Sequence, residues 1–252
     1  MQVEGTTAIV TGAASGLGAA TAAALASAGD WVIGLDIATP GSAGDIPDGI
    51  RLITADITDE DAVRAAIATV EPHHPPLRFA VNCAGIAPAQ RVLSGKGVHE
   101  LALFRRTMEV NLIGTFNVLR LAAEAIARTK PDEDGQRGVI VNTASIAAFD
   151  GQIGQVAYAA SKSGVVGLTL SAARELARHG IRVVTIAPGI VDTPLLAALG
   201  PEVNASLAQG IPFPHRLARP DEYGSLVLTV LEHDYLNGET IRMDGALRMA
   251  PQ

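Results

Sequence analysis

Short runs of β-branched residues alternate along this chain with longer segments in which apolar residues recur at helical spacing. The β-branched runs predict seven strands, at Thr7–Thr11, Trp31–Leu35, Ile50–Thr54, Phe79–Asn82, Val139–Asn142, Ile181–Ile186 and Thr240–Met243. The helical spacing predicts helices at about 16–28, 59–70, 99–128, 155–178 and 221–232. This order is typical of an α/β fold in which a doubly wound parallel sheet carries helices on both faces.

No internal repeat or low-complexity linker divides the 252 residues, so we expect one domain over 1–252. Two proline- and glycine-containing segments, 86–97 and about 192–219, interrupt the alternation. Long loops in a compact domain are often functional, and ligands of open parallel sheets lie beyond the carboxyl ends of the strands. We therefore expect 192–219 to be a substrate loop.

Composition excludes several classes of partner. The net charge of -7 and pI of about 5.3 leave no excess of basic residues for nucleic-acid binding. Glu4 and three early glycines do not suit a signal peptide, and no run approaches the roughly 18 uninterrupted apolar residues of a membrane span. We expect a cytoplasmic protein that does not bind membranes.

Metal binding is not expected. Cys83 is the single cysteine, which excludes an intramolecular disulfide and suits a reducing compartment. His73 and His74 are adjacent, but no nearby carboxylate or third histidine completes a metal site. A solvated loop is the preferred interpretation of this pair.

A glycine-rich turn follows the first predicted strand and opens the first helix. It contains Gly12, Ser15, Gly16, Leu17 and Gly18. Glycine lets the backbone approach a pyrophosphate closely, and free N–H groups at a helix start can bind its oxygens. A tight turn could use the same glycines for conformation alone, but the position between strand and helix favours dinucleotide binding.

Asp36 ends the second strand, where a carboxylate can accept hydrogen bonds from both hydroxyls of an adenosine ribose. The same charge repels the 2′-phosphate of NADP, and no Lys or Arg occurs between Thr11 and Arg51 to attract it. We therefore expect NAD as the cofactor; the alternative is that Asp36 only starts a turn.

Asp56 and Ile57 follow the third strand. Asp56 could present a carboxylate to the adenine amino group, and Ile57 an apolar wall to its ring. A helix N-cap is the alternative role for Asp56.

Tyr158 and Lys162 lie four residues apart in a predicted helix and so share one face. A neighbouring ammonium is expected to lower the pKa of a tyrosine, which suits the phenol for proton exchange with an alcohol or ketone oxygen. Ser145 follows the fifth strand and could hydrogen-bond the same oxygen. Taken singly, each residue is equally explained as an ordinary surface or turn residue.

The glycine turn, Asn82–Gly85, Ser145 and Tyr158-x-x-x-Lys162 together, in this order, resemble the short-chain dehydrogenase/reductase family from end to end. The resemblance implies a Rossmann-type seven-stranded sheet. It also implies that Ser145, Tyr158 and Lys162 are catalytic, with Asn111 completing the set through a water-mediated proton path. A helix kink or a satisfied core amide is the alternative for Asn111.

The resemblance further implies two groups of cofactor-binding residues. Those expected to line the riboses are Asn82, Cys83, Ala84 and Gly85, with Cys83 a wall residue rather than a nucleophile. Those expected to hold the nicotinamide amide are Pro188, Gly189, Val191 and Thr193. Tyr158 and Lys162 would also contact the cofactor.

Distinctive strings such as Asn142–Phe149, Ile211–His215 and Asp244–Arg248 are most similar to family members that act on 3-hydroxyacyl-CoA thioesters. This implies oxidation of a C3 hydroxyl of an acyl-CoA with hydride transfer to NAD, in fatty acid metabolism. Gln155 could reach the substrate carbonyl, or be a solvated or interhelical residue. The bases available for CoA phosphates are scattered, at Arg91, Lys96, His215 and Arg216.

Other functions stay open. A hydroxysteroid or other secondary-alcohol dehydrogenase uses the same chemistry, whereas an NADPH-linked carrier-protein reductase is disfavoured by Asp36. A non-catalytic NAD-binding scaffold is expected to have lost Tyr158 or Lys162, and both are present. Family members are usually tetramers, so we expect a homotetramer, for which the helices at 99–128 and 155–178 could supply apolar faces.

Overall fold

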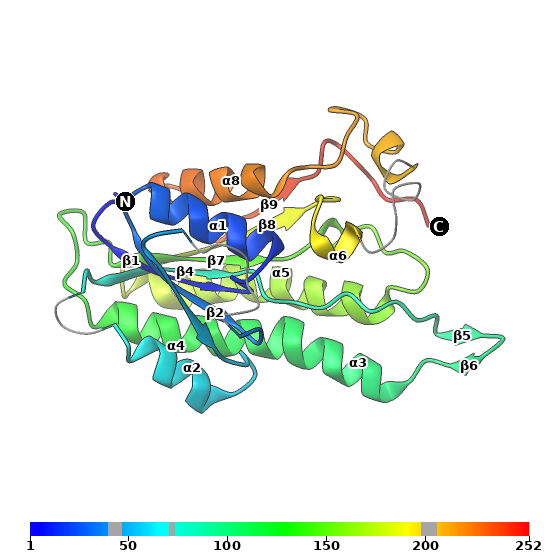
Figure 1. Ribbon diagram of the computed structural model, residues 1–252, viewed down its shortest axis with the longest axis horizontal. Helices are drawn as coiled ribbons and strands as arrows, with labels where there is room; N and C mark the ends of the chain where they lie inside the picture. The colour runs from blue at the N-terminus through cyan, green and yellow to red at the C-terminus, as the bar shows by residue number, and fades with distance from the viewer. Residues whose placement is uncertain (40–46, 71–73, 198–205, 252) are drawn as a thin grey trace.

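The computed structural model describes residues 1–39, 47–70, 74–197 and 206–251 (Figure 1). All seven predicted strands form and pair in parallel in one sheet of order β3-β2-β1-β4-β7-β8-β9. Their bounds are β1 Thr7–Thr11, β2 Trp31–Asp36, β3 Ile50–Thr54, β4 Leu77–Asn82, β7 Gly138–Thr143, β8 Ile181–Pro188 and β9 Thr240–Met243. The Rossmann-type fold class is confirmed.

Helices cover both faces of this sheet, as Figure 1 shows. One face carries α1 (Gly16–Ser27) and α8 (Pro220–Glu232). The other carries α2 (Glu60–Ile67), α4 (Thr115–Ala127) and α5 (Val156–Ala177). A core therefore forms on each side of the sheet.

Side chains alternate between these two cores along each strand. In β7, Val139 and Val141 pack on the side of α1 and α8, whereas Ile140 packs on the side of α4 and α5. Because both faces are covered, β1, β7 and β8 are buried at every residue. This explains why the apolar runs in the sequence are continuous.

The order of the strands reverses between β1 and β4. The chain proceeds from β1 outward through β2 and β3, and then crosses back to place β4 on the other side of β1. A crevice forms at such a reversal beyond the carboxyl ends of the strands. The glycine turn after β1 and the Asn82–Gly85 segment after β4 both lie at this edge.

The segment predicted as one helix at 99–128 is helical over Leu101–Ala127 but contains a π-helical turn. This turn, η2 (Glu109–Gly114), separates α3 (Leu101–Met108) from α4. Among the described residues, Leu101–Ala127 is the one helix long and apolar enough to cross a membrane. Since 61% of its most apolar window is buried within the fold, it has the character of a core helix.

Both predicted excursions leave the sheet. The first contains an unpredicted antiparallel hairpin, β5 (Leu93–Ser94) with β6 (Gly97–Val98), which projects from the body at the right of Figure 1. The second begins with α6 (Pro194–Ala197) and includes 198–205, which lie outside the described residues. A bridge between Val191 and Ala218 closes its base.

His73 also lies outside the described residues, whereas the ring of His74 stacks on Trp31 with 5.4 Å between ring centroids. Within the described ranges, no group of three or more His, Cys, Asp or Glu side chains is placed to hold a metal ion.

Candidate active site

A cavity of about 750 Å³ lies at the carboxyl edge of the sheet, next to the strand-order reversal. Most predicted site residues line it: Gly12, Ser15, Gly16, Leu17, Gly18, Asp36, Asp56, Ile57, Cys83, Ala84, Gly85, Ser145, Gln155, Tyr158, Lys162, Pro188, Gly189, Val191 and Thr193. We call this cavity the main cleft. Asn82 and Asn111 lie behind its wall.

The glycine turn has a geometry that only glycine permits. Gly12 has a φ of +68°, and its N–H donates to the carbonyl oxygen of Leu35 at 2.8 Å. A Cβ at Gly18 would lie 2.1 Å from the carbonyl oxygen of Gly12, so no larger residue fits. Helix α1 begins immediately after Ser15, whose side chain makes no capping hydrogen bond to any described residue. The N–H groups at this helix start thus fit a dinucleotide pyrophosphate.

The carboxylate of Asp36 is fixed at the end of β2. It accepts hydrogen bonds from the backbone N–H groups of Ala14 and Ala38, both at 2.9 Å. The bond from Ala14 connects Asp36 to the glycine turn, as a cofactor-binding role requires. The bond from Ala38 shows that Asp36 also starts a turn, which was the alternative interpretation. Its place in the main cleft beside the turn fits an adenosine ribose.

Asp56 does not cap a helix, and that alternative was wrong. The N-cap of α2 is Asp59, whose carboxylate accepts from the N–H groups of Asp61 and Ala62. Asp56 instead accepts from the backbone N–H of Thr58 at 2.9 Å. This bond, together with weaker effects of the Thr58 hydroxyl and of Arg106, lowers the pKa of Asp56.

Arg106 is a member of the main cleft that sequence reasoning missed. Its guanidinium lies 3.7 Å from a carboxylate oxygen of Asp56. It enters from α3, distant in sequence from the glycine turn, so inspection of residues 12–50 alone could not find it.

Asn82 ends β4, and Cys83 follows it. The amide of Asn82 donates to Asn142 of β7 at 2.9 Å and joins the two strands behind the cleft. The next two N–H groups, of Cys83 and Ala84, both donate to the hydroxyl of Thr11 at 3.0 Å. Burial raises the pKa of the Cys83 thiol, so the thiol stays protonated, which suits a wall residue.

Tyr158, Lys162 and Ser145 converge in the main cleft. The ammonium of Lys162 lies 5.9 Å from the centre of the Tyr158 ring and donates to the carbonyl oxygen of Thr143 at 2.8 Å. Ser145 caps the short helix η3 (Ile146–Ala148), accepts from the N–H of Ala147, and has a side-chain hydrogen bond to Tyr158. Three groups able to exchange or stabilise a proton therefore face one space.

Burial dominates the electrostatics of this group. It raises the pKa of Tyr158, and the hydrogen bond with Ser145 opposes the rise only in part. It also lowers the pKa of Lys162 to about 8. The net lowering of the tyrosine pKa that the neighbouring ammonium led us to expect is not found, because desolvation of the phenol raises this pKa more than the Ser145 hydrogen bond lowers it.

Asn111 lies in the π-helical turn and is fully buried. Its side chain accepts from the N–H of Ile86 and donates to the carbonyl of Ile86, both at 2.8 Å, and also donates to Ser161. The side chain is thus a satisfied core amide that holds the segment after Gly85. Its role in proton transfer stays a prediction.

Gln155 precedes α5 and lines the main cleft. Its amide oxygen is buried and has no hydrogen-bond partner among the described residues. An unpaired buried oxygen is costly, so this site favours a ligand that donates to or replaces it.

The other lining residues were not among the predicted site residues. They are Leu35, Ile37, Ala55, Ile86, Ala87, Ala89, Val110, Thr143, Ala144, Ile146, Ala147, Gln152, Ile190, Pro194, Leu196, Leu207 and Met249. Met249 arrives from the opposite end of the chain from the glycine turn. The segment that carries it is held by hydrogen bonds from Ile153 to Pro251 at 2.9 Å and from Gln152 to Ala250 at 3.1 Å.

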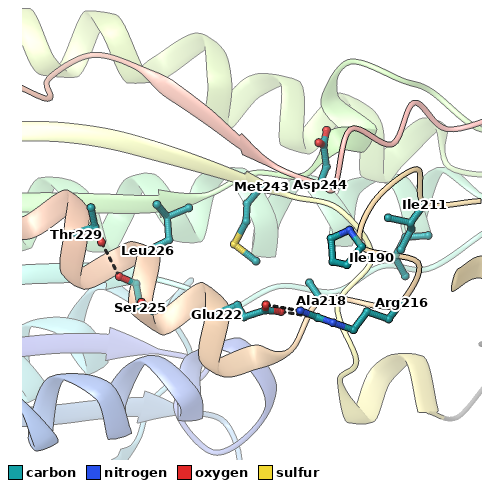
Figure 2. Close-up of a pocket in the computed structure, with 12 residues that line it drawn as sticks. Ile190, Ile211, Arg216, Ala218, Glu222, Ser225, Leu226, Thr229, Met243 and Asp244 are labelled. Atoms are coloured by element: carbon teal, nitrogen blue, oxygen red, sulfur yellow. Dashed lines mark hydrogen bonds and ion pairs between the residues drawn. The ribbon is translucent and has the colours of Figure 1, made fainter.

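A second cavity of about 350 Å³ lies between the start of α8, the end of β9 and the 211–218 segment. Figure 2 shows the guanidinium of Arg216 directed at the carboxylate of Glu222, with hydrogen bonds of 2.7 and 2.8 Å. Arg216, one of the bases considered for CoA phosphates, is therefore paired outside the lining of the main cleft.

The chain matches known proteins over nearly its whole length. A family model described as short chain dehydrogenase matches residues 6–204. The chain is 51% identical over 250 residues to 3-hydroxyacyl-CoA dehydrogenase type-2 of Drosophila melanogaster, covering 96% of this chain and 97% of that protein. It is 49% identical over 256 residues to the Homo sapiens protein of the same name, covering 99% and 97%.

A solved structure agrees with these sequence matches. The crystal structure of 3-hydroxyacyl-CoA dehydrogenase type-2 from Mycobacterium avium has a TM-score of 0.94 and 43% identity, covering 100% of this chain and 99% of that one. The chain therefore belongs to the short-chain dehydrogenase/reductase family, oxidoreductases that interconvert secondary alcohols and ketones with a nicotinamide cofactor.

Proposed function

We propose that the protein is an NAD-dependent 3-hydroxyacyl-CoA dehydrogenase, which interconverts 3-hydroxyacyl-CoA and 3-ketoacyl-CoA. The observation that carries this proposal is the near 50% identity, over almost the full length, to relatives with that name. The convergence of Ser145, Tyr158 and Lys162 in the main cleft supports the chemistry.

In this proposal the cofactor lies along the main cleft. The glycine turn binds the pyrophosphate, Asp36 the adenosine ribose, and Asp56 with Ile57 the adenine. Cys83, Ala84 and Gly85 line the riboses, and Asn82 supports them from behind. The nicotinamide amide is held by Pro188, Gly189, Val191 and Thr193. When bound, the nicotinamide exchanges the hydride at C3 of the substrate.

The protein supplies positioning and proton transfer. Ser145 donates a hydrogen bond to the C3 oxygen, and Tyr158 removes its proton during oxidation. Lys162 uses one of its three donors on Thr143, so two stay available for the nicotinamide ribose and for electrostatic support of the tyrosine. Asn111 completes the proton path behind Lys162.

The acyl-CoA substrate is supported by the place of Gln155 in the same cleft, where its amide nitrogen is proposed to donate a hydrogen bond to the thioester carbonyl. The unpaired amide oxygen is then left to accept from a donor of the bound ligand. The 192–219 segment, which contributes Thr193, Leu196 and Leu207 to the cleft wall, is proposed as the substrate loop.

The proposed preference for NAD rests on Asp36, because its negative charge repels the 2′-phosphate of NADP. Steady-state kinetics with NADH and NADPH test it directly. We expect kcat/KM to favour NADH by at least about 100-fold, on the order of 3 kcal/mol. Comparable efficiency with both cofactors would overturn the assignment. Arg106 would then be the cleft residue whose positive charge binds the 2′-phosphate of NADPH.

The reaction is tested by following NADH absorbance with acetoacetyl-CoA, with a 3-hydroxyacyl-CoA and with a hydroxysteroid. We expect turnover of the two thioesters and a loss of at least about 100-fold in kcat for Tyr158→Phe. Turnover of the steroid alone would favour a hydroxysteroid dehydrogenase. NADH binding without turnover of any substrate would favour a non-catalytic scaffold.

We further propose that the protein is a homotetramer, that it is cytoplasmic, and that it acts in fatty acid metabolism. Apolar side chains exposed on the outer helices support an interface, with Ile113 at 48%, Phe116 at 51% and Leu170 at 47% exposure. Analytical ultracentrifugation tests the tetramer, and Phe116→Glu with Leu170→Glu is expected to yield smaller species.

A further inference from the structure

Tyr223 is the largest fully buried side chain of the described structure, and its hydroxyl has a polar partner within the core. It comes from α8, packs with Val139 and Val141, and places its oxygen 2.6 Å from the hydroxyl of Thr143. The Thr143 hydroxyl in turn points at the sulfur of Cys83, at 3.7 Å. The phenol therefore donates to Thr143, and Thr143 to the thiol.

Thr143 is the last residue of β7 and has two functions at once. Its side chain faces α8, in line with Val139 and Val141 on the same side of the strand. Its carbonyl oxygen accepts a hydrogen bond of 2.8 Å from the ammonium of Lys162. Lys162 comes from α5, on the opposite side of the sheet from α8 (Figure 1). The Thr143 carbonyl oxygen is the one protein acceptor recorded for the ammonium within the described ranges.

We infer that Tyr223 is a positioning residue for Lys162, which acts across the sheet through Thr143. The phenol fixes the Thr143 hydroxyl, and the hydroxyl fixes the strand end whose carbonyl holds the ammonium. This role of Tyr223 rests on the role of Lys162 in the proposed function. Tyr223 itself belongs to none of the motifs that predict site residues.

The position of the Lys162 ammonium depends on its hydrogen bond to the Thr143 carbonyl. Lys162 is 4% exposed, and its ammonium lies next to the backbone of Gly85, where an added Cβ would be in ordinary van der Waals contact with the nitrogen at 3.6 Å. Ser145 follows Thr143 by two residues, so movement of the strand end displaces the serine hydroxyl as well. A small displacement of the Lys162 ammonium or the Ser145 hydroxyl is expected to reduce the catalytic rate, although no reacting group is removed.

The test is Tyr223→Phe, which removes one oxygen atom, with Tyr235→Phe as the matched control because Tyr235 is 96% exposed. For Tyr223→Phe we expect kcat to fall about three- to tenfold with little change in KM. The pH at half-maximal kcat is expected to rise by about 0.3–1 unit, since a less well placed ammonium supports the tyrosine base less. The control is expected to match wild type.

Thr143→Val and the double variant identify the route. If Tyr223 acts through Thr143, Thr143→Val shows the same loss, the double variant loses no more than either single variant, and Thr143→Ser recovers most of the kcat that Thr143→Val loses. Losses that multiply in the double variant overturn the inference. A Tyr223→Phe enzyme with unchanged kcat and pH profile also overturns it, even if its melting temperature falls.

A readout that does not need turnover separates this inference from the proposed function. Pulse labelling with acetic anhydride, read by mass spectrometry, reports the accessibility of Lys162, with the exposed Lys96 and Lys130 as internal references. We expect at least about twofold faster labelling of Lys162 in Tyr223→Phe and Thr143→Val. Unchanged labelling counts against the inference, whether or not the tested substrates react.

Discussion

At the scale of single residues, the fold contains a carboxyl group that the proposed chemistry does not use. Asp30 lies before β2, is 4% exposed, and accepts a hydrogen bond from the hydroxyl of Thr6. Its second oxygen is buried with no partner in the described part of the chain. Burial raises the pKa of Asp30 to about 7, an effect that the hydrogen bonds of Thr6 only partly oppose.

This raised pKa makes stability depend on pH. The folded protein holds the proton up to about pH 7, whereas the unfolded chain releases it near 3.8. The contribution of Asp30 to stability is therefore complete below pH 3.8, falls as the pH rises, and is lost once the pH passes 7. Asp30→Asn is expected to stabilise the protein at pH 8 relative to wild type, by about 1–4 kcal/mol.

Urea denaturation at pH 5 and pH 8 measures this difference, with Asp48→Asn as the control because Asp48 is exposed. The gain from Asp30→Asn should be larger at pH 8 than at pH 5. An equal gain at both values would show that Asp30 does not titrate in this range.

At the scale of elements, the turn between β1 and α1 has little tolerance for added side-chain atoms. A Cβ at Gly18 meets the Gly12 carbonyl, whereas one at Gly95, in the β5–β6 turn, meets nothing within 4 Å. We predict that Gly18→Ala weakens NADH binding by at least about 30-fold, about 2 kcal/mol, because the first turn of α1 must move. Gly95→Ala should bind as wild type does.

Fluorescence titration of NADH measures this effect, and circular dichroism shows whether Gly18→Ala folds. Equal affinity in the two variants would remove the glycine turn from the cofactor site. A folded Gly18→Ala protein with weak binding would separate the local turn from the global fold.

Sequence periodicity was sufficient for the sheet and the long helices, because apolar runs such as those of β7 and β8 are local signals of burial. It could not show the π-helical turn, within which Asn111 bonds the backbone of Ile86, 25 residues away in the sequence. The β5–β6 hairpin was missed because two-residue strands with exposed side chains have no periodicity. Motifs predicted most of the residues that line one side of the cleft, while Arg106 and Met249 are brought there only by the tertiary fold.

At the scale of the whole molecule, the main cleft combines residues from the first and last parts of the chain. Met249 lines it and packs near Ile146, Ile211 and Leu247. Its segment is anchored by Ile153 and Gln152, which also precede the Tyr158 helix. In the proposed function, the segment that carries Met249 thus forms part of the wall that a substrate meets.

We predict that Met249→Ala shifts substrate preference toward longer acyl chains, because it removes side-chain volume from the wall. The ratio of kcat/KM for a ten-carbon over a four-carbon 3-ketoacyl-CoA should rise about three- to thirtyfold. Arg248→Gln, at the exposed neighbouring position, is the control. An unchanged ratio for Met249→Ala would place the acyl chain elsewhere in the cleft.

The place of Met249 also has a consequence for biosynthesis. A ribosome delivers the glycine turn first and Met249 more than two hundred residues later, so the residues that the proposed function assigns to the dinucleotide are all synthesised before the proposed substrate wall is complete. Competence to bind the dinucleotide should therefore precede competence to select a substrate.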